Sequence, residues 1–132
     1  MYKKPGIIIE TDLQEGVYAA SGCFIGQAVI DSTPQENGTP YYELWLTGTH
    51  SGDHYSNGCQ YIITFNQNVI YFDMDGEGSG SATGSILTVN YDTSARAIKP
   101  SENVGHGRVR VTSGDNLEII NVQMLETGAF TR

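Results

Sequence analysis

The chain has 132 residues, a length that fits one domain able to bury a core without metals or cross-links. Its formal net charge of -8 would repel a phosphate backbone, so the composition argues against nucleic acid as a partner. No apolar run approaches the roughly 18 residues of a membrane helix, so no membrane span is expected. The 16 glycines and 8 tyrosines favour strands and turns over helices.

The first expected element is a short strand over residues 6–10, GIIIE. It follows a basic start, but its apolar run is too short for the core of a secretory signal. Residues 1–22 are therefore interpreted as an N-terminal segment, either an edge strand or a leader. Residues 23–132 are expected to form the β domain.

A second strand is expected over residues 23–31, CFIGQAVID, and a third over 41–49, YYELWLTGT. Pro and Asn-Gly in the intervening stretch predict a turn there. The third strand alternates, with Leu44 and Leu46 on one face. The opposite face carries Tyr41, Glu43, Trp45 and Thr47.

The aromatic residues of this third strand are candidates for ligand binding. Aromatic side chains on an outer sheet face can form a platform for sugar rings or for a partner protein. Tyr41 and Trp45 would supply that platform, while Tyr42 shares the leucine face. The alternative is that Tyr41 and Trp45 face the core and a loop covers the leucines.

A loop is expected over residues 50–58, HSGDHYSNG, because its Ser-Gly and Asn-Gly pairs favour turns. The His-x-x-x-His spacing indicates zinc when it lies on a helix, and a loop removes that geometric reason. A third ligand would have to come from Asp53 or His106. The alternative is that these polar side chains cap the turn. The candidate ligand-binding residues of this loop are His50, Asp53, His54 and Tyr55.

The centre of the chain is expected to form a hairpin of CQYIITFN and NVIYFD, with Gln67-Asn68 as its tight turn. SILTVNY, residues 85–91, alternates so that Leu87, Val89 and Tyr91 share one face.

The longest connection, residues 92–107, has room for one helical turn. In the following strand, RVRVTS, Val109 and Val111 are expected inward with Arg108 and Arg110 outward. The apolar pattern of the last strand changes phase near Ile119-Ile120, which a β-bulge would explain.

An acidic stretch, YFDMDGEGSGSATG, spans residues 71–84. Its carboxylates and Gly78 match the first half of an EF-hand loop, but Gly84 stands where the template needs a bidentate Glu, and strands flank it. It is therefore not an EF-hand. A looser calcium site is one interpretation, and a solvated connection that keeps a sheet edge soluble is the other. The candidate metal ligands are Asp73, Asp75, Glu77 and Ser79.

The sequence offers little that indicates catalysis. It contains no Gly-x-Ser-x-Gly elbow, no Cys-x-x-Cys pair and no phosphate-binding glycine loop. Glu43 and Asp53 could form a carboxylate pair for glycoside hydrolysis, but any acidic surface offers such pairs. We therefore expect a protein that is not an enzyme. Cys23 and Cys59 allow either one disulfide, which would suit export, or two buried thiols.

Residues 3–23, KKPGIIIETDLQEGVYAASGC, run from a Lys-Pro start into a cluster of small residues. This segment resembles the opening of small, uncharacterised exported or surface proteins of gut Firmicutes. The stretches ITFNQNVIYF and GHGRVRVTSGDNLEI are similar to the body of the same proteins. The segment also resembles the leaders of exported peptides, which would imply cleavage near Ser21-Gly22. The resemblance implies an extracellular or cell-surface setting, and it implies no mechanism.

About eight short strands separated by turns predict an all-β, single-domain antiparallel β-sandwich of the jelly-roll kind. The leading functional hypothesis is a non-enzymatic interaction module that binds a carbohydrate or a protein partner. The alternative is a homo-oligomeric structural subunit of an extracellular filament or phage particle, with the N-terminal strand making the subunit contacts. A metal-dependent enzyme using the histidine loop is the weakest interpretation.

Overall fold

The computed structural model describes residues 24–51, 55–76, 78–92 and 98–130. The strand expected over residues 6–10, the whole segment 1–22 and Cys23 lie outside this part of the chain. No helix within the described ranges has the length and apolar character needed to cross a membrane.

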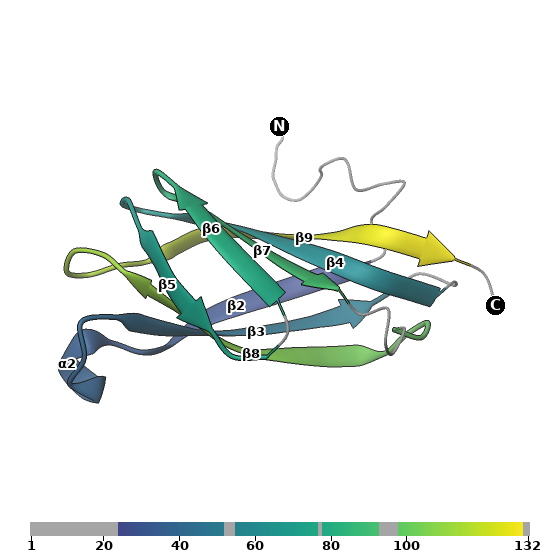
Figure 1. Cartoon of the computed structure of the whole chain (residues 1–132), viewed down its shortest axis with the longest axis horizontal. Helices are drawn as coiled ribbons and strands as arrows, with labels where there is room; N and C mark the ends of the chain where they lie inside the picture. Colours follow the sequence, from purple (N-terminus) through teal and green to yellow (C-terminus); the bar gives the residue numbers. More distant parts are fainter. Residues whose placement is uncertain (1–23, 52–54, 77, 93–97, 131–132) are drawn as a thin grey trace.

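Two four-stranded antiparallel sheets stack face to face, as Figure 1 shows. The first sheet has the order β2-β3-β8-β5 and the second the order β6-β7-β4-β9. The prediction of an all-β sandwich is confirmed. In chain order the strands are β2 (Phe24–Ser32), β3 (Tyr42–His50), β4 (Tyr55–Phe65), β5 (Ile70–Met74), β6 (Gly78–Thr83), β7 (Ile86–Asp92), β8 (Asn103–Thr112) and β9 (Ile119–Phe130).

The strand pairs are nested in the manner of a jelly roll. β3 pairs with β8 in one sheet, and β4 pairs with β7 in the other. The chain crosses from one sheet to the other at every connection between consecutive strands except β2–β3 and β6–β7. Most neighbours within a sheet therefore come from distant parts of the sequence.

The core forms where alternate side chains of both sheets meet. Leu44 and Leu46 of β3 are fully buried, and so are Val109 and Val111 of β8. This confirms the inward faces expected for those strands. The second sheet buries Tyr61, Ile63, Leu87 and Val89 against them.

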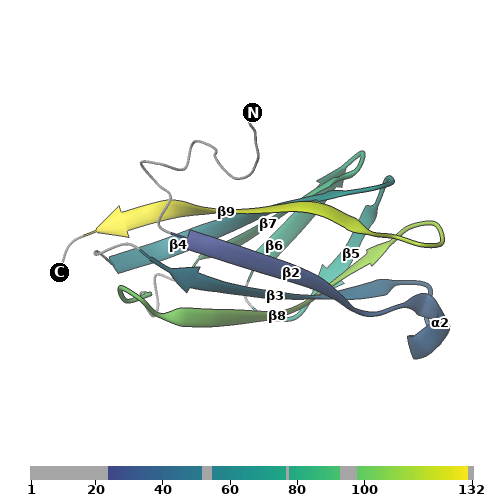
Figure 2. The same ribbon diagram turned by 180° about the vertical axis from the view of Figure 1, so that it is seen from behind.

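The two sheets approach closely at the edge formed by β2 and β9, which Figure 2 shows from the opposite side. Gly26 of β2 makes this approach possible. A Cβ atom at Gly26 would lie 2.6 Å from the Cβ of Met124 on β9, a distance that real carbon atoms do not tolerate. The absence of a side chain at Gly26 therefore sets the spacing of the sheets along this edge.

The turn between β2 and β3 contains one helical turn, α2 (Pro34–Asn37). Pro34 begins it, where a missing N–H costs nothing, and the backbone N–H of Thr33 donates to Oε1 of Glu36 at 3.1 Å. Gly38 ends it with φ of +71°, which glycine adopts without strain. This turn lies at one end of the sandwich (Figure 1).

The hairpin expected around Gln67-Asn68 is wrong. β4 and β5 belong to different sheets, since β4 pairs with β7 and β9 while β5 pairs with β8. The Asn68 region is a crossing between the sheets, where the Val69 N–H donates to the Gly84 carbonyl and the Ser113 hydroxyl to the Asn68 carbonyl. A turn-forming pair bends the chain without deciding which sheet the next strand joins.

The acidic Gly/Ser stretch is also only partly a connection, because residues 78–83 form strand β6 at the edge of the second sheet. Its pairing with β7 supplies the backbone hydrogen bonds, and Gly80 leaves room for the ring of Tyr71.

In β9, the irregularity expected from the sequence is confirmed. The register shifts where Thr64 pairs with Asn121 and Phe65 with Ile119, so Ile120 is left without a partner in the ladder.

Candidate functional site

The outer face of the sheet β2-β3-β8-β5 carries the exposed aromatic residues predicted from the sequence. Trp45 lies there with 37% of its surface exposed, on the side of β3 opposite the buried leucines. The alternative, in which Trp45 packs into the core, is wrong. Tyr41 lies just before β3, and its ring stacks on that of Phe72 from β5 with 5.1 Å between centroids. We call this surface, defined by Tyr41, Trp45, Phe72, Arg108 and Arg110, the aromatic face.

Arg108 supports Trp45 from the neighbouring strand. The register places Arg108 of β8 directly opposite Trp45 of β3, and its guanidinium carbon lies 5.5 Å from the centre of the indole ring. That distance is typical of a cation–π contact. The same guanidinium donates from Nε to Asp31 at 3.0 Å and lies 3.9 Å from Glu43.

Arg110 has the same role two residues further along β8. Its guanidinium lies 5.8 Å from the centre of the Tyr41 ring and donates from Nε to Glu43 at 2.9 Å. It also donates to Asp73 at 3.0 Å and to Asp75 at 3.1 Å. These hydrogen bonds to Asp73, Asp75 and Glu43 raise the pKa of Arg110 above its already high ordinary value.

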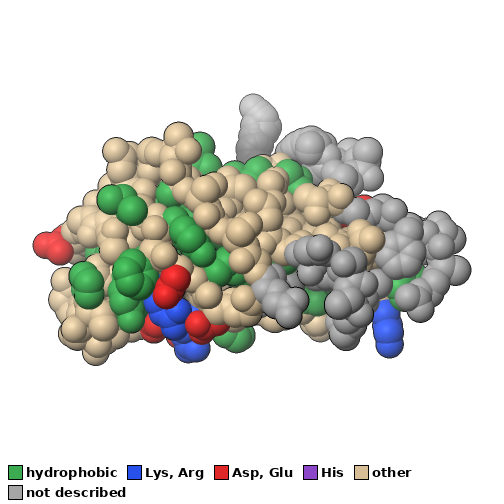
Figure 3. Space-filling view, in the orientation of Figure 1, with side chains coloured by type: hydrophobic (Ala, Val, Ile, Leu, Met, Phe, Trp, Pro, Cys, Tyr) green, Lys and Arg blue, Asp and Glu red, His purple; other side chains and the backbone are tan. Residues whose placement is uncertain are grey.

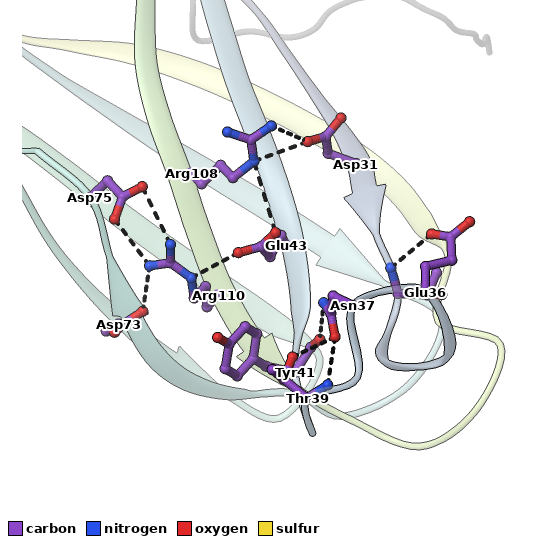
Figure 4. Close-up of polar contacts among 11 residues, drawn as sticks. Asp31, Glu36, Asn37, Thr39, Tyr41, Glu43, Asp73, Asp75, Arg108 and Arg110 are labelled. Carbon is purple, nitrogen blue, oxygen red and sulfur yellow. Dashed lines mark hydrogen bonds and ion pairs between the residues drawn. The ribbon is translucent and has the colours of Figure 1, made fainter.

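These contacts form a charge ladder that crosses all four strands of the sheet, as Figure 4 shows. The order of groups is Asp31, Arg108, Glu43 and Arg110, followed by the two aspartates of the β5 end. In the view of Figure 3, basic and acidic side chains gather together beside hydrophobic ones near the lower left. The ladder fixes the positions of both arginines, and through them the rings of Trp45 and Tyr41.

A shallow groove of about 410 Å³ opens on the same sheet, on the far side of Trp45 from the charge ladder. Thr47 and Gly105, which pair across β3 and β8, form its floor together with small neighbours. The nearest atom to a Cβ built on Gly105 would be Cζ2 of Trp45, at 3.6 Å, so the indole borders the floor. The described residues that line it are Ile25, Gly26, Gln27, Thr47, Gly48, Thr49, Asn103, Val104 and Gly105.

A register shift in β8 shapes the groove. Leu46 pairs with Gly107 and Thr47 with Gly105, so one residue of β8 has no partner between them. Gly107 adopts φ of +89°, a conformation that glycine reaches without strain. The shift leaves Gly105, rather than a residue with a side chain, beside Trp45. The groove residues were not predicted from the sequence, and the alternation of Ile25, Gln27 and Val29 was the available signal.

His50 of the histidine loop does not join an exposed site. His50 is the last residue of β3, and it is fully buried on the core face. Its ring stacks on Phe24 with 4.6 Å between centroids, Nδ1 lies 3.0 Å from the Lys99 carbonyl, and Nε2 lies 3.7 Å from Glu126. A side chain in this position supports the end of the sandwich and is closed to an external ligand.

Of the other candidate residues, some lie outside the described part of the chain and one is half-buried. Asp53 and His54 lie outside the described residues, and so does the side chain of His106. Tyr55 is half-buried at the start of β4, which begins earlier than the sequence predicted. The part of the loop that the structure describes therefore does not join the aromatic face.

Of the described candidate calcium ligands, Asp73 and Asp75 lie together, while Ser79 lies on the other sheet. Asp73 and Asp75 both bind Arg110, which supplies the positive charge that a calcium ion was expected to supply. Ser79 is exposed on β6 in the other sheet, and Glu77 lies outside the described residues. Within the described ranges, no group of three or more His, Cys, Asp or Glu side chains is placed to hold a metal ion. Calcium at this stretch stays a prediction.

Cys59 lies at the centre of β4 and is fully buried against the core. Burial raises the pKa of its thiol to about 12. A thiol that stays protonated at neutral pH is a poor nucleophile and metal ligand.

No protein-family model matches the chain, and no curated protein matches it in sequence. The resemblance to proteins of gut Firmicutes therefore stays a prediction.

Proposed function

We propose that this protein is a non-enzymatic binding module, exported or surface-associated, that binds a carbohydrate or a protein partner through its aromatic face. The observation that carries the proposal is the position of Trp45. A large indole is exposed on the outside of a sheet whose other side is fully packed. The guanidinium carbon of Arg108 lies 5.5 Å from the centre of its ring. A side chain with no packing role in the core is available for a partner.

The arrangement around Trp45 supports this proposal. Trp, Tyr and Arg are the residues that most often carry the binding energy of an interface. Here Trp45 and Tyr41 are each paired with an arginine, and both arginines are held by carboxylates from other strands of the same sheet. Side chains fixed before binding lose less conformational entropy when a partner arrives.

The exported or cell-surface setting rests on the sequence. The chain is acidic and rich in glycine and tyrosine, and its N-terminal segment resembles those of exported proteins. Direct detection of the native protein in culture supernatant or on intact cells tests that setting.

The proposal predicts that Trp45→Ala abolishes most binding while the fold survives. We expect the affinity to fall at least about tenfold, because the substitution removes a central aromatic side chain. Glycan arrays and pull-downs from host and bacterial surface extracts measure binding, and circular dichroism with a thermal melt checks the fold.

Ile86→Ala is the matched control. Ile86 is an exposed hydrophobic residue of β7 in the other sheet, 43% exposed, so its truncation removes similar surface away from the aromatic face. Unchanged binding by a folded Trp45→Ala protein would remove Trp45 from the site.

We propose a structural subunit of a filament or phage particle as the second candidate, and edge strand β5 favours it. Ile70 and Phe72 of β5 are 69% and 54% exposed, which is unusual for large hydrophobic side chains at a sheet edge. No described strand pairs with the outer edge of β5, so it could accept an extended segment of another subunit.

A further inference from the structure

The groove beside Trp45 has the shape of a small-ligand subsite. The middle strand β3 supplies Thr47 and Thr49. β2 places Ile25 and Gln27 on one side of them, and β8 places Asn103 and Gly105 on the other. The indole of Trp45 lies next to Gly105. Its volume of about 410 Å³ falls within the range of roughly 300–1,000 Å³ typical of small-molecule sites.

The lining is polar but uncharged. Thr47 and Thr49 present hydroxyl groups, and Gln27 and Asn103 present amide groups, so the groove offers both donors and acceptors. The Thr49 hydroxyl donates to Oδ1 of Asn103 at 2.8 Å, which holds that amide in place. Among the described residues that line the groove, none carries a charged side chain.

Apolar surface borders these polar groups. Ile25, which is 68% exposed, lies on the β2 side, and the indole of Trp45 lies beside Gly105 at the border of the groove. A pyranose ring carries hydroxyl groups at its rim and C–H groups on its faces. Its surface therefore matches a groove with amides and hydroxyls along the sides and an aromatic side chain at one end.

The neighbouring charges disfavour an anionic ligand. Arg108 contacts the indole, but Asp31 and Glu43 already bind it. The whole chain carries a formal net charge of -8. An acidic ligand would meet net repulsion, and a neutral one would not.

We propose that this groove binds a neutral saccharide, with Gln27 and Asn103 as hydrogen-bonding residues and Trp45 as the apolar wall. The inference rests on the proposed binding function of the aromatic face, and it adds the ligand class and the residues that recognise it. Gly105 contributes by having no side chain, so that part of the groove floor stays free for the ligand.

The test uses the full chain against soluble neutral glycans and anionic ones in the same assay. Maltoheptaose, cellohexaose, xylohexaose, chitohexaose and yeast mannan form the neutral set, and polygalacturonate and heparin form the anionic set. Calorimetry and affinity electrophoresis at low and high salt measure binding. We expect binding to at least one neutral glycan, with little dependence on salt.

Four variants locate the site. Gly105→Leu fills the floor and should reduce affinity at least about tenfold, as should Trp45→Ala. Asn103→Ala and Gln27→Ala should each reduce it about three- to tenfold, the loss of one or two hydrogen bonds. Ser81→Leu is the matched control, because it adds the same bulk to exposed strand β6 of the other sheet, and it should bind like the natural protein.

Each outcome of this test rejects a different part of the proposal, namely the groove, the neutral ligand class or the saccharide ligand. Loss of glycan binding in Trp45→Ala, but not in Asn103→Ala, Gln27→Ala or a folded Gly105→Leu protein, would keep the aromatic face and reject the groove. Preference for the anionic set, weakened by salt, would reject the neutral class. If no glycan binds while a protein partner is captured in a manner that depends on Trp45, the saccharide inference fails and the proposed function stands.

Discussion

At the scale of single residues, the buried titratable side chains of β4 and β7 define how the protein responds to alkali. Cys59 and Tyr61 are adjacent inward residues of β4, and Tyr91 packs against Tyr61 edge to face. Burial raises the pKa of the Cys59 thiol from 9.0 to about 12 and raises the pKa values of both tyrosines well above their ordinary value. Each group therefore favours the protonated state in the folded protein.

We predict that the free energy of unfolding falls as the pH rises above about 9. Between pH 9.0 and about 12 the folded protein keeps the Cys59 proton that the unfolded chain loses, so unfolding becomes progressively easier. Below pH 9 both states hold the proton and the effect vanishes. Each such group contributes a slope of up to about 1.4 kcal/mol per pH unit.

Urea unfolding at intervals from pH 7 to 11 measures this slope, with Cys59→Ala as the comparison. The variant should be less stable at pH 7, because it leaves a small cavity, and its stability should fall less steeply between pH 9 and 11. Parallel pH profiles for the two proteins would show that the Cys59 thiol does not control the alkaline response.

At the scale of strands, glycines on the two faces of one sheet have opposite roles. Gly26 faces inward, where an added Cβ would lie 2.6 Å from the Cβ of Met124. Gly105 faces outward, where the nearest atom would be Cζ2 of Trp45 at an ordinary 3.6 Å. The same substitution should therefore have different effects at the two positions.

We predict that Gly26→Ala destabilises the protein by about 1–3 kcal/mol, the typical cost of overpacking a core. The obstacle is a Cβ atom fixed to the β9 backbone, so one strand must shift. Gly105→Ala serves as the control and should leave stability within about 0.5 kcal/mol. Chemical denaturation of the natural protein, Gly26→Ala and Gly105→Ala measures these differences. If Gly26→Ala were as stable as the natural protein, the β2–β9 edge would be looser than the structure indicates.

Strands with strong alternation could be predicted from the sequence, and strands defined by their neighbours could not. Leu44 and Leu46, and likewise Val109 and Val111, follow a period of two that specifies which side is buried. Strand β6 has no such pattern, since residues 78–83 read GSGSAT, and it exists because β7 pairs with it. Local sequence carries no information about that partner.

The same distinction explains how much of the site was predictable. The outward position of Trp45 followed from alternation within one strand. The charge ladder and the groove depend on register between strands, which places Arg108 opposite Trp45 and Gly105 opposite Thr47. His50 was misassigned because a histidine in a polar run resembles a loop residue, although it continues the inward period of β3 through to the strand end.

At the scale of the whole molecule, self-association distinguishes the two candidate functions. For the binding module we expect the purified chain to be monomeric, and deletion of residues 1–10 to leave that state unchanged. For the structural subunit, the N-terminal strand would pair with a neighbour, and the same deletion would abolish assembly. Light scattering over a concentration series, before and after the deletion, measures the difference. We predict a monomer in both proteins, and concentration-dependent growth that the deletion removes would favour the structural subunit.

The nested strand pairing also determines when the chain can fold during synthesis. β3 must wait for β8, and β4 pairs with both β7 and β9, which are synthesised well after it. Such long-range pairings close large loops before they gain any stabilising contact, so folding is slow. A nascent chain shortened before residue 119 would lack β9 and would expose one whole edge of β4. An unpaired strand edge of this kind promotes aggregation. The sandwich can therefore complete its fold only after β9 has been synthesised.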